Sequence, residues 1–180
     1  MKTPLLASLC VAALALTACD KKPNEAPASS AATTSSPATP PPATVALSTN
    51  NLKDIKNDLI EIQTLSNNRS KEALDLQDKA NQAAQKGDKA SLRTTVAEMK
   101  TYIANFNRDL DALALKSTEL DKVREKIKES NNLGIELSEE SIAEKPDMKK
   151  FDELRNRAMQ LQKELVADMQ ALENKVKTAQ

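Results

Sequence analysis

The stretch that decides the predicted fold is residues 92–127, which read LRTTVAEMKTYIANFNRDLDALALKSTELDKVREKI. Apolar side chains recur in this stretch at alternating steps of four and three residues, which is the spacing of a heptad seam. The seam consists of Leu92, Val96, Met99, Ile103, Phe106, Leu110, Leu113, Leu120 and Ile127. Only Ser117 and Arg124 interrupt it. The pattern predicts one long amphipathic helix whose apolar stripe must be covered by other helices.

The segments on either side have the same period. The first carries Leu52, Ile55, Leu59, Ile62, Ala73, Leu76, Ala80 and Ala83, and the last carries Phe151, Leu154, Ala158, Leu161, Leu165 and Leu172. Gly87-Asp88 combines a helix stop with an N-cap, and Pro146-Asp147 is a typical helix start. We therefore expect helices over about 52–86, 89–130 and 147–178. Gly134 is expected to end the second helix, and residues 132–146 to form an acidic connector.

The short connection at Gly87-Asp88 makes the first two helices antiparallel neighbours. We predict an all-α domain over residues 51–180, built as an elongated, antiparallel, coiled-coil-like three-helix bundle. The alternative is a helical hairpin whose third helix is exchanged between protomers, because exposed heptad seams also form dimers. The sequence leaves the choice between monomer and dimer open.

Composition narrows the range of chemistry. The chain has no histidine, and its 26 acidic residues balance its 26 basic residues. The common general base and the commonest metal ligand are therefore missing, and no glycine-rich phosphate loop or calcium loop occurs. Balanced charge gives no reason to expect electrostatic attraction to nucleic acid or to anionic lipid. We expect no catalytic residue, no cofactor and no metal site, and hence no enzyme.

The N-terminus combines Lys2, a short apolar run over residues 5–18, and the tetrapeptide Leu16-Thr17-Ala18-Cys19. This arrangement resembles the signal peptide and lipobox of bacterial lipoproteins. The resemblance implies that residues 1–18 are removed and that Cys19, lipidated on its thiol, becomes the first residue. Cys10 would be discarded with the signal peptide, which leaves no thiol for a disulfide or a metal.

Family resemblance also suggests a destination. Asp20 resembles the inner-membrane retention signal of enteric bacteria, but Lys21 departs from the strong form of that signal. We favour a periplasm-facing protein anchored in the outer membrane over one anchored in the inner membrane. Residues 19–50 are rich in Pro, Ala, Ser and Thr, so we expect a disordered tether. Residues 28–37 resemble segments that some Gram-negative bacteria O-glycosylate, although an unmodified spacer is the preferred reading.

Polar residues near the helix seams are the remaining candidates. In a hairpin closed at Gly87-Asp88, Arg69 lies within reach of Asp109, and we expect a salt bridge that fixes helix register. Tyr102 flanks the seam, where it either packs at the core edge, which we favour, or offers its ring to a partner. The acidic connector is expected to be a solvated loop; its alternative role is contact with a basic partner. The residues concerned are Glu136, Glu139, Glu140 and Glu144.

The function favoured by the sequence is a non-enzymatic, lipid-anchored helical module of the cell envelope that acts as a scaffold or interaction subunit. Its partners would be the membrane, through the lipid on Cys19, and envelope proteins that the sequence does not identify. The alternative is a periplasmic regulator or chaperone-like protein that holds client segments in a groove between helices.

Overall fold

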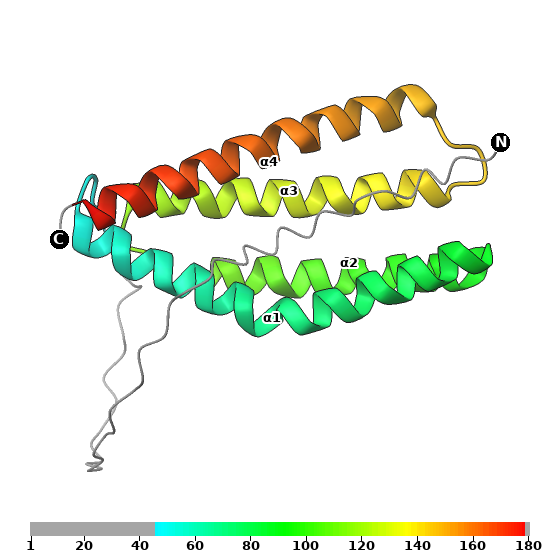
Figure 1. Cartoon of the computed structure of the whole chain (residues 1–180), viewed down its shortest axis with the longest axis horizontal. Helices are drawn as coiled ribbons and strands as arrows, with labels where there is room; N and C mark the ends of the chain where they lie inside the picture. The colour runs from blue at the N-terminus through cyan, green and yellow to red at the C-terminus, as the bar shows by residue number, and fades with distance from the viewer. Residues whose placement is uncertain (1–45, 179–180) are drawn as a thin grey trace, which may run out of the picture.

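The computed structural model describes residues 46–178 and contains four helices within them. They are α1 Leu52–Lys86, α2 Lys89–Asp111, α3 Thr118–Ile142 and α4 Met148–Lys177. Successive helices run in alternating directions along one long axis (Figure 1). The all-α prediction is confirmed, but the predicted three-helix count is wrong for these residues. The predicted signal peptide, Cys19 and residues 19–45 of the predicted tether lie outside the described residues.

The α1–α2 hairpin closes as its residues suggest. Gly87 takes the left-handed conformation, with φ of 65°, which glycine adopts without a steric penalty. The Asp88 side chain accepts a hydrogen bond from the backbone N–H of Ser91 at 3.0 Å and so caps α2. Asn51 and Asp147 cap α1 and α4 in the same way. As a result, α1 and α4 match the segments predicted over 52–86 and 147–178.

The single helix predicted over 89–130 is wrong, because the chain turns a corner over residues 112–117. The buried Asp58 of α1 accepts hydrogen bonds from the backbone N–H of Lys116 at 3.0 Å and of Ser117 at 2.7 Å. The Ser117 hydroxyl donates to the same carboxylate at 2.5 Å. Asp58 therefore accepts, from another helix, the N–H groups of the two residues that lead into α3, while the buried Leu115 fills the core beneath.

Arg124 secures the other side of this corner. Its guanidinium donates to the backbone carbonyls of Leu110 at 3.5 Å and Leu113 at 3.3 Å, which belong to the end of α2 and the loop after it. Carbonyls at a helix C-terminus have no partner within the helix, so a basic side chain stabilises them. Ser117 and Arg124, the two interruptions of the heptad seam, are thus the residues that hold the corner.

The predicted helix end at Gly134 is also wrong, since α3 continues to Ile142. A Cβ placed on Gly134 would meet nothing within 4 Å, so no close approach of another chain segment requires glycine there. Its neighbours Leu133 and Ile135 are both buried. Their burial outweighs the cost of about 1 kcal/mol that an interior glycine imposes on a helix.

The core consists of two clusters of different composition. The first draws on all four helices and the corner; it comprises Ile55, Leu59, Ile62, Phe106, Leu110, Leu115, Leu120, Val123, Ile127, Leu165, Met169 and Leu172. The second comprises Ala73, Leu76, Met99, Tyr102 and Ile135 and contains no residue of α4. We call the half around the first cluster the closed half, and the half that carries Gly87 and the α3–α4 connection the open half.

Residues just before α1 already contact the closed half. The backbone N–H of Ser48 donates to the carbonyl of Lys116 at 2.7 Å, and the N–H of Thr118 donates to the carbonyl of Ser48 at 2.9 Å. Residues 48–50, which the sequence analysis assigns to the tether, are therefore attached to the bundle. Within residues 46–178, no helix has an apolar stretch long enough to cross a membrane.

Candidate functional site

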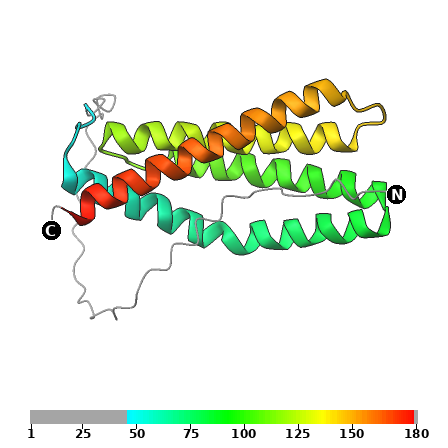
Figure 2. The ribbon, with the colours of Figure 1, turned by 45° about the horizontal axis from the view of Figure 1, so that its top comes forward.

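The feature that distinguishes this bundle is the separation of α4 from α1. In the closed half the two helices are linked by the Gln63 amide, which donates to the Glu173 carboxylate at 3.2 Å. Toward the α3–α4 connection their ribbons move apart in both views (Figures 1 and 2). The burial of α4 follows this separation, because Leu161, Leu165 and Met169 are buried whereas no residue over 148–160 is.

Helix periodicity shows which side chains face the gap. On α4, Met159 lies two heptads before Glu173, the residue that faces α1, and Met148 lies a further eleven residues back. Both spacings are close to whole numbers of turns, so the three residues share one face of the helix. On α1, Leu74 lies three turns after Gln63, which faces α4. The faces that meet in the closed half therefore continue into the open half with no helix opposite.

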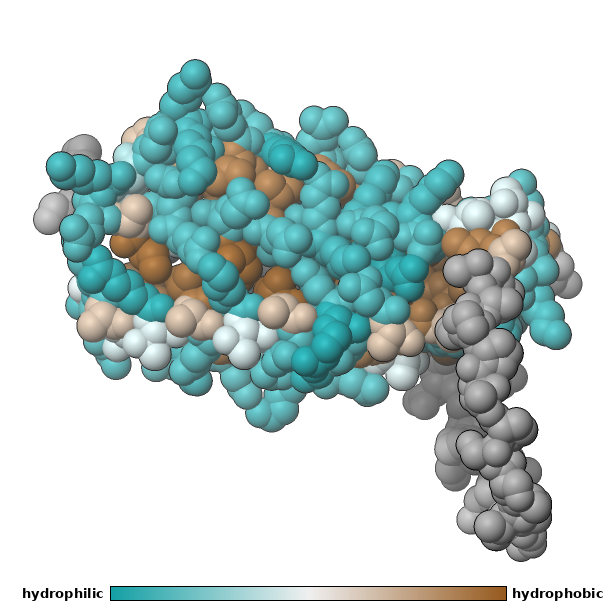
Figure 3. Space-filling model, turned by 180° about the vertical axis from the view of Figure 1, so that it is seen from behind, coloured by the Kyte–Doolittle hydropathy of each residue, from teal (hydrophilic) through white to brown (hydrophobic). Residues whose placement is uncertain are grey.

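Apolar side chains on these faces are unusually exposed. Leu74 is 53%, Met148 59% and Met159 57% exposed, while Phe151 and Ala158 of α4 are half-buried beside them. We call these five residues the open face. From the opposite side of the molecule, further hydrophobic side chains are visible between hydrophilic ones along the middle of the open half (Figure 3). Exposed apolar side chains also occur in the closed half, where Ile60 is 52% exposed; what distinguishes the open half is that the part of α4 in it contains no buried residue.

Ion pairs to α3 hold the outer part of α4 in place. Arg157 pairs with Glu129 at 2.5 Å, and Lys150 pairs with Glu140 at 2.9 Å. Glu140 also accepts a hydrogen bond from the backbone N–H of Asp147 at 2.7 Å. This backbone hydrogen bond, together with Lys150, lowers the pKa of Glu140. The position of α4 in the open half is therefore set by α3 and not by α1.

Two shallow pockets lie along the same α3–α4 contact, with volumes of about 380 Å³ and 340 Å³. The Arg157–Glu129 pair contributes to the walls of both. Most of the residues that line them carry charge of either sign, including Lys126, Lys128 and Glu136. In this they differ from the open face.

The predicted pair Arg69 and Asp109 is brought together by the α1–α2 hairpin as an ion pair. The hydrogen bond from Arg69 is the main reason that the pKa of Asp109 is lowered, and it likewise raises the pKa of Arg69. Arg69 also pairs with Glu72 at 3.3 Å on its own helix. Both side chains of the interhelical pair are about one-third exposed, so solvent screens their attraction.

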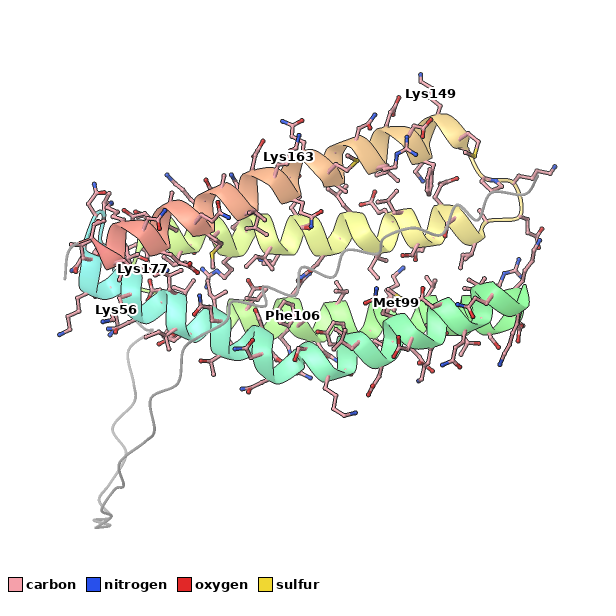
Figure 4. The ribbon with its side chains drawn as sticks, viewed as in Figure 1. Lys56, Met99, Phe106, Lys149, Lys163 and Lys177 are labelled. Atoms are coloured by element: carbon pink, nitrogen blue, oxygen red, sulfur yellow. The ribbon has the colours of Figure 1, made fainter. Side chains whose placement is uncertain are left out.

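Tyr102 lies inside the bundle. Its side chain is 8% exposed, its ring stacks on Phe106 with 6.1 Å between centroids, and its hydroxyl donates to the Arg69 carbonyl at 3.2 Å. Burial raises the pKa of this phenol. The view with side chains shows Phe106 and Met99 on the same helix (Figure 4). The possible role of Tyr102 as a surface contact for a partner is therefore wrong, because its ring is already packed against α1 and α2.

The acidic connector predicted over 132–146 is mostly helical, because α3 reaches Ile142. Glu139 pairs with Lys100 at 2.7 Å, and Glu144 pairs with Arg93 at 3.3 Å, so both carboxylates tie the end of α3 to α2. Glu140 is buried in the contact with α4 described above. Glu136 is exposed on the wall of the larger pocket. Three of the four acids proposed as partner contacts are thus engaged within the bundle.

Sequence reasoning missed Asp58 and the open face. An acid beside a heptad seam is usually solvated, so nothing in the local pattern marks Asp58 as buried. The open face did leave a signal, because Leu74, Met148 and Met159 are apolar residues outside the predicted heptad positions. Such residues on the outer side of a bundle helix are candidates for an intermolecular contact.

Comparison with known proteins gives one family. A family model described as "Uncharacterised lipoprotein PM1805" matches residues 56–177, which include almost all of the four helices. No curated protein and no solved structure matches the chain. The family match agrees with the lipobox at residues 16–19 and confirms the prediction of a bacterial lipoprotein. The chain belongs to the family of uncharacterised lipoproteins described as PM1805.

Proposed function

We propose that this lipoprotein is a non-enzymatic interaction module of the cell envelope and that its open face binds a helical segment of another envelope protein. Cys19 would carry the lipid, and the helical domain would face the periplasm. We favour the outer membrane over the inner membrane as the site of anchoring, because Lys21 departs from the strong form of the retention signal that Asp20 resembles. The observation that carries the proposal is the exposure of apolar side chains on α1 and α4 where these helices separate.

The open face has the chemistry of a groove that accepts an amphipathic helix. Such grooves combine a few large apolar anchors with charged residues at their margins. Here Leu74 lies on one side and Met159, Phe151 and Met148 on the other, while Lys71 and Asp75 form an ion pair on α1 next to Leu74. A helix of the partner in this space would be the fifth, and it would cover the faces that α1 and α4 cover for each other in the closed half.

The alternative is a chaperone-like protein that holds client segments in the same place. The two methionines of the open face favour this candidate, because unbranched, polarisable side chains adapt to different apolar surfaces. A dedicated module should bind one partner, whereas a client-holding protein should bind several. The two candidates use the same surface and differ in the number of products obtained by crosslinking.

The test is site-specific photocrosslinking in cells of the native organism, with the photoreactive residue at Met159 or, as a control, at Glu153. Glu153 is exposed in the same half of α4 but lies about a third of a turn away from the open face. We expect one dominant product from Met159 and none from Glu153. Several products from Met159 would favour client holding, and equal products from both positions would contradict the proposal.

A second pair of variants shows whether the captured protein is bound by the apolar face. Leu74→Lys with Met148→Lys places charge on side chains that are more than half exposed, so folding should be retained. Gln82→Lys with Ala167→Lys adds the same charge at exposed positions on other faces of α1 and α4. The first pair should abolish the Met159 product and the second should leave it unchanged. A product that survives the first pair would contradict binding through the open face.

A further inference from the structure

Lysines gather at the end of the closed half. The first turn of α1, the corner, the start of α3 and the last turn of α4 meet there, and each contributes at least one. They are Lys53, Lys56, Lys116, Lys122, Lys175 and Lys177, all exposed except for the half-buried Lys175. Figure 4 shows Lys56 and Lys177 at this end, on α1 and α4 respectively. Lys175 donates to the Asn50 side chain at 2.5 Å and Lys177 lies 3.8 Å from the Glu173 carboxylate, so within the described part of the chain the unpaired ammonium groups at this end come from α1, the corner and α3.

Four carboxylates at the same end form hydrogen bonds or ion pairs within the bundle. Asp54 accepts a hydrogen bond from the Ser48 hydroxyl at 2.7 Å, and Glu119 accepts one from the Asn50 backbone N–H at 2.8 Å. Asp58 is 1% exposed beneath the corner, and Asp121 pairs with Arg124. Each of these four carboxylates is therefore less exposed than the unpaired lysines and has a partner within the bundle.

Among residues 46–178, four of these lysines have no ion-pair partner; they are Lys53, Lys56, Lys116 and Lys122. The ion pairs between neighbouring helices lie instead along the length of the bundle, for example between α1 and α2, α2 and α3, and α3 and α4. Although the whole chain has a net charge of zero, its charges are therefore distributed unevenly at this end. The unpaired lysines can therefore attract an anion that approaches this end along the long axis. At physiological ionic strength this attraction acts over a screening length of about 8 Å.

This end is also where the chain arrives from its N-terminus. Residue 46 is the first described residue, and Ser48 is bonded to the corner beside Lys116. Only 26 residues lie between residue 46 and Cys19, the predicted lipid attachment site. Even at full extension a chain of that length reaches no more than about 90 Å, so the lipid anchor keeps the bundle near the bilayer. Leu47 and Leu52 add partly exposed apolar side chains to the same end.

We propose that the lysine-bearing end of the closed half docks on the anionic phospholipid headgroups of the leaflet that holds the lipid anchor. The long axis of the bundle then stands away from the membrane, and the open half is directed toward the periplasm. Each lysine that reaches an anionic surface strengthens association about fivefold. This inference depends on the lipoprotein anchor and is independent of the partner proposed for the open face.

The test uses the mature, lipidated chain in vesicles, with a single fluorescent label on an introduced cysteine. The label is placed at Ala114 in the corner or at Ala143 beside the α3–α4 connection, both of which are exposed. Lipids that carry a quencher in their headgroup region report contact with the bilayer. With about one-third anionic phospholipid, we expect strong quenching at Ala114 and little at Ala143. Quenching at Ala114 should decrease severalfold in neutral vesicles and between about 0.05 and 0.5 M salt.

Charge reversal provides the matched comparison. The triple variant Lys53→Glu, Lys56→Glu and Lys177→Glu should reduce quenching at Ala114 to the level in neutral vesicles. The control triple Lys145→Glu, Lys149→Glu and Lys163→Glu changes exposed residues elsewhere by the same total charge and should have no effect. Equal quenching in anionic and neutral vesicles, or equal quenching at both label positions, would overturn the proposal. The salt series on the protein without charge reversal tests the electrostatic contact even if the first triple variant fails to fold.

Discussion

Replacing Asp58 with alanine should be among the most damaging single changes in this protein. Its carboxylate is buried and accepts hydrogen bonds from two backbone N–H groups and one hydroxyl at the corner between α2 and α3. The side chain of Ser117, the N-cap residue of α3, forms no capping bond, and the N–H of Thr118 donates to the Ser48 carbonyl. The variant therefore leaves the backbone N–H groups of Lys116 and Ser117, just before α3, without their acceptor.

The magnitude follows from the number of donors left unsatisfied. A hydrogen bond to a charged group contributes about 1.5–3 kcal/mol, and a buried donor without a partner costs about 1–3 kcal/mol. Water reaches Lys116, which is exposed, more readily than Ser117, which is 0% exposed, so the three losses are not equal. Alanine also favours α1 by a few tenths of a kcal/mol. We expect a net loss of about 3–5 kcal/mol, a large part of the total of about 5–15 typical of a domain.

The measurement is urea denaturation followed by circular dichroism, combined with amide hydrogen exchange. Asp58→Ala should lower the free energy of unfolding as stated and speed exchange at the amides of Lys116 and Ser117. Asp78→Ala is the control, because Asp78 is exposed on the same helix and should change stability by no more than about 0.5 kcal/mol. A loss below about 1 kcal/mol for Asp58→Ala, with unchanged exchange at the corner, would refute the role given to this carboxylate.

Three further predictions concern the core, the α3–α4 contact and the anchor. Leu110→Ala removes a side chain that is 0% exposed and should cost about 2–5 kcal/mol, whereas Lys116→Ala should stay within about 0.5 in the same denaturation assay. Because the pKa of Glu140 is lowered in the folded protein, its contribution is complete above the ordinary glutamate pKa and is lost as pH falls through the lowered value. After correction for the intrinsic pH dependence of exchange, amides at the start of α4 should therefore lose protection in acid, and Glu140→Gln should flatten that dependence. Cys19→Ser should abolish attachment through the lipid without changing the helical signal; membrane fractions and circular dichroism measure the two effects.

Much of the fold followed from periodicity, because apolar stripes report where helices are covered. The segments of α1 and α4 could be predicted with their ends, since Gly87 and Asp147 are local signals that act within one turn. The corner over 112–117 could not, because it contains neither glycine nor proline. It depends on the distant acceptor Asp58, whose partners are 58 and 59 residues away. The helix end predicted at Gly134 was wrong because a local signal was overridden by tertiary contacts, namely the burial of its neighbours Leu133 and Ile135.

Part of the candidate site could likewise be predicted from the sequence, and part could not. Arg69 and Asp109 could be paired from the sequence because the tight turn at Gly87 fixes the register of the hairpin, so that residue numbers alone give the opposing positions. The open face could not be placed, because exposure of Leu74 and Met159 depends on the direction in which α4 crosses α3. That direction is set by long-range contacts such as the Arg157–Glu129 pair, which the heptad pattern does not encode.

The most direct test of the central claim is a pair of distances between spin labels in the mature protein, measured by pulsed electron paramagnetic resonance. One pair replaces Asn57 on α1 and Gln170 on α4 in the closed half, and the other replaces Leu74 and Met159 in the open half; all four positions are exposed. We predict a short distance for the first pair and a clearly longer, single distribution for the second. Equal short distances in both halves would show that α1 and α4 stay together along their length, and would contradict the open face on which the proposed function rests.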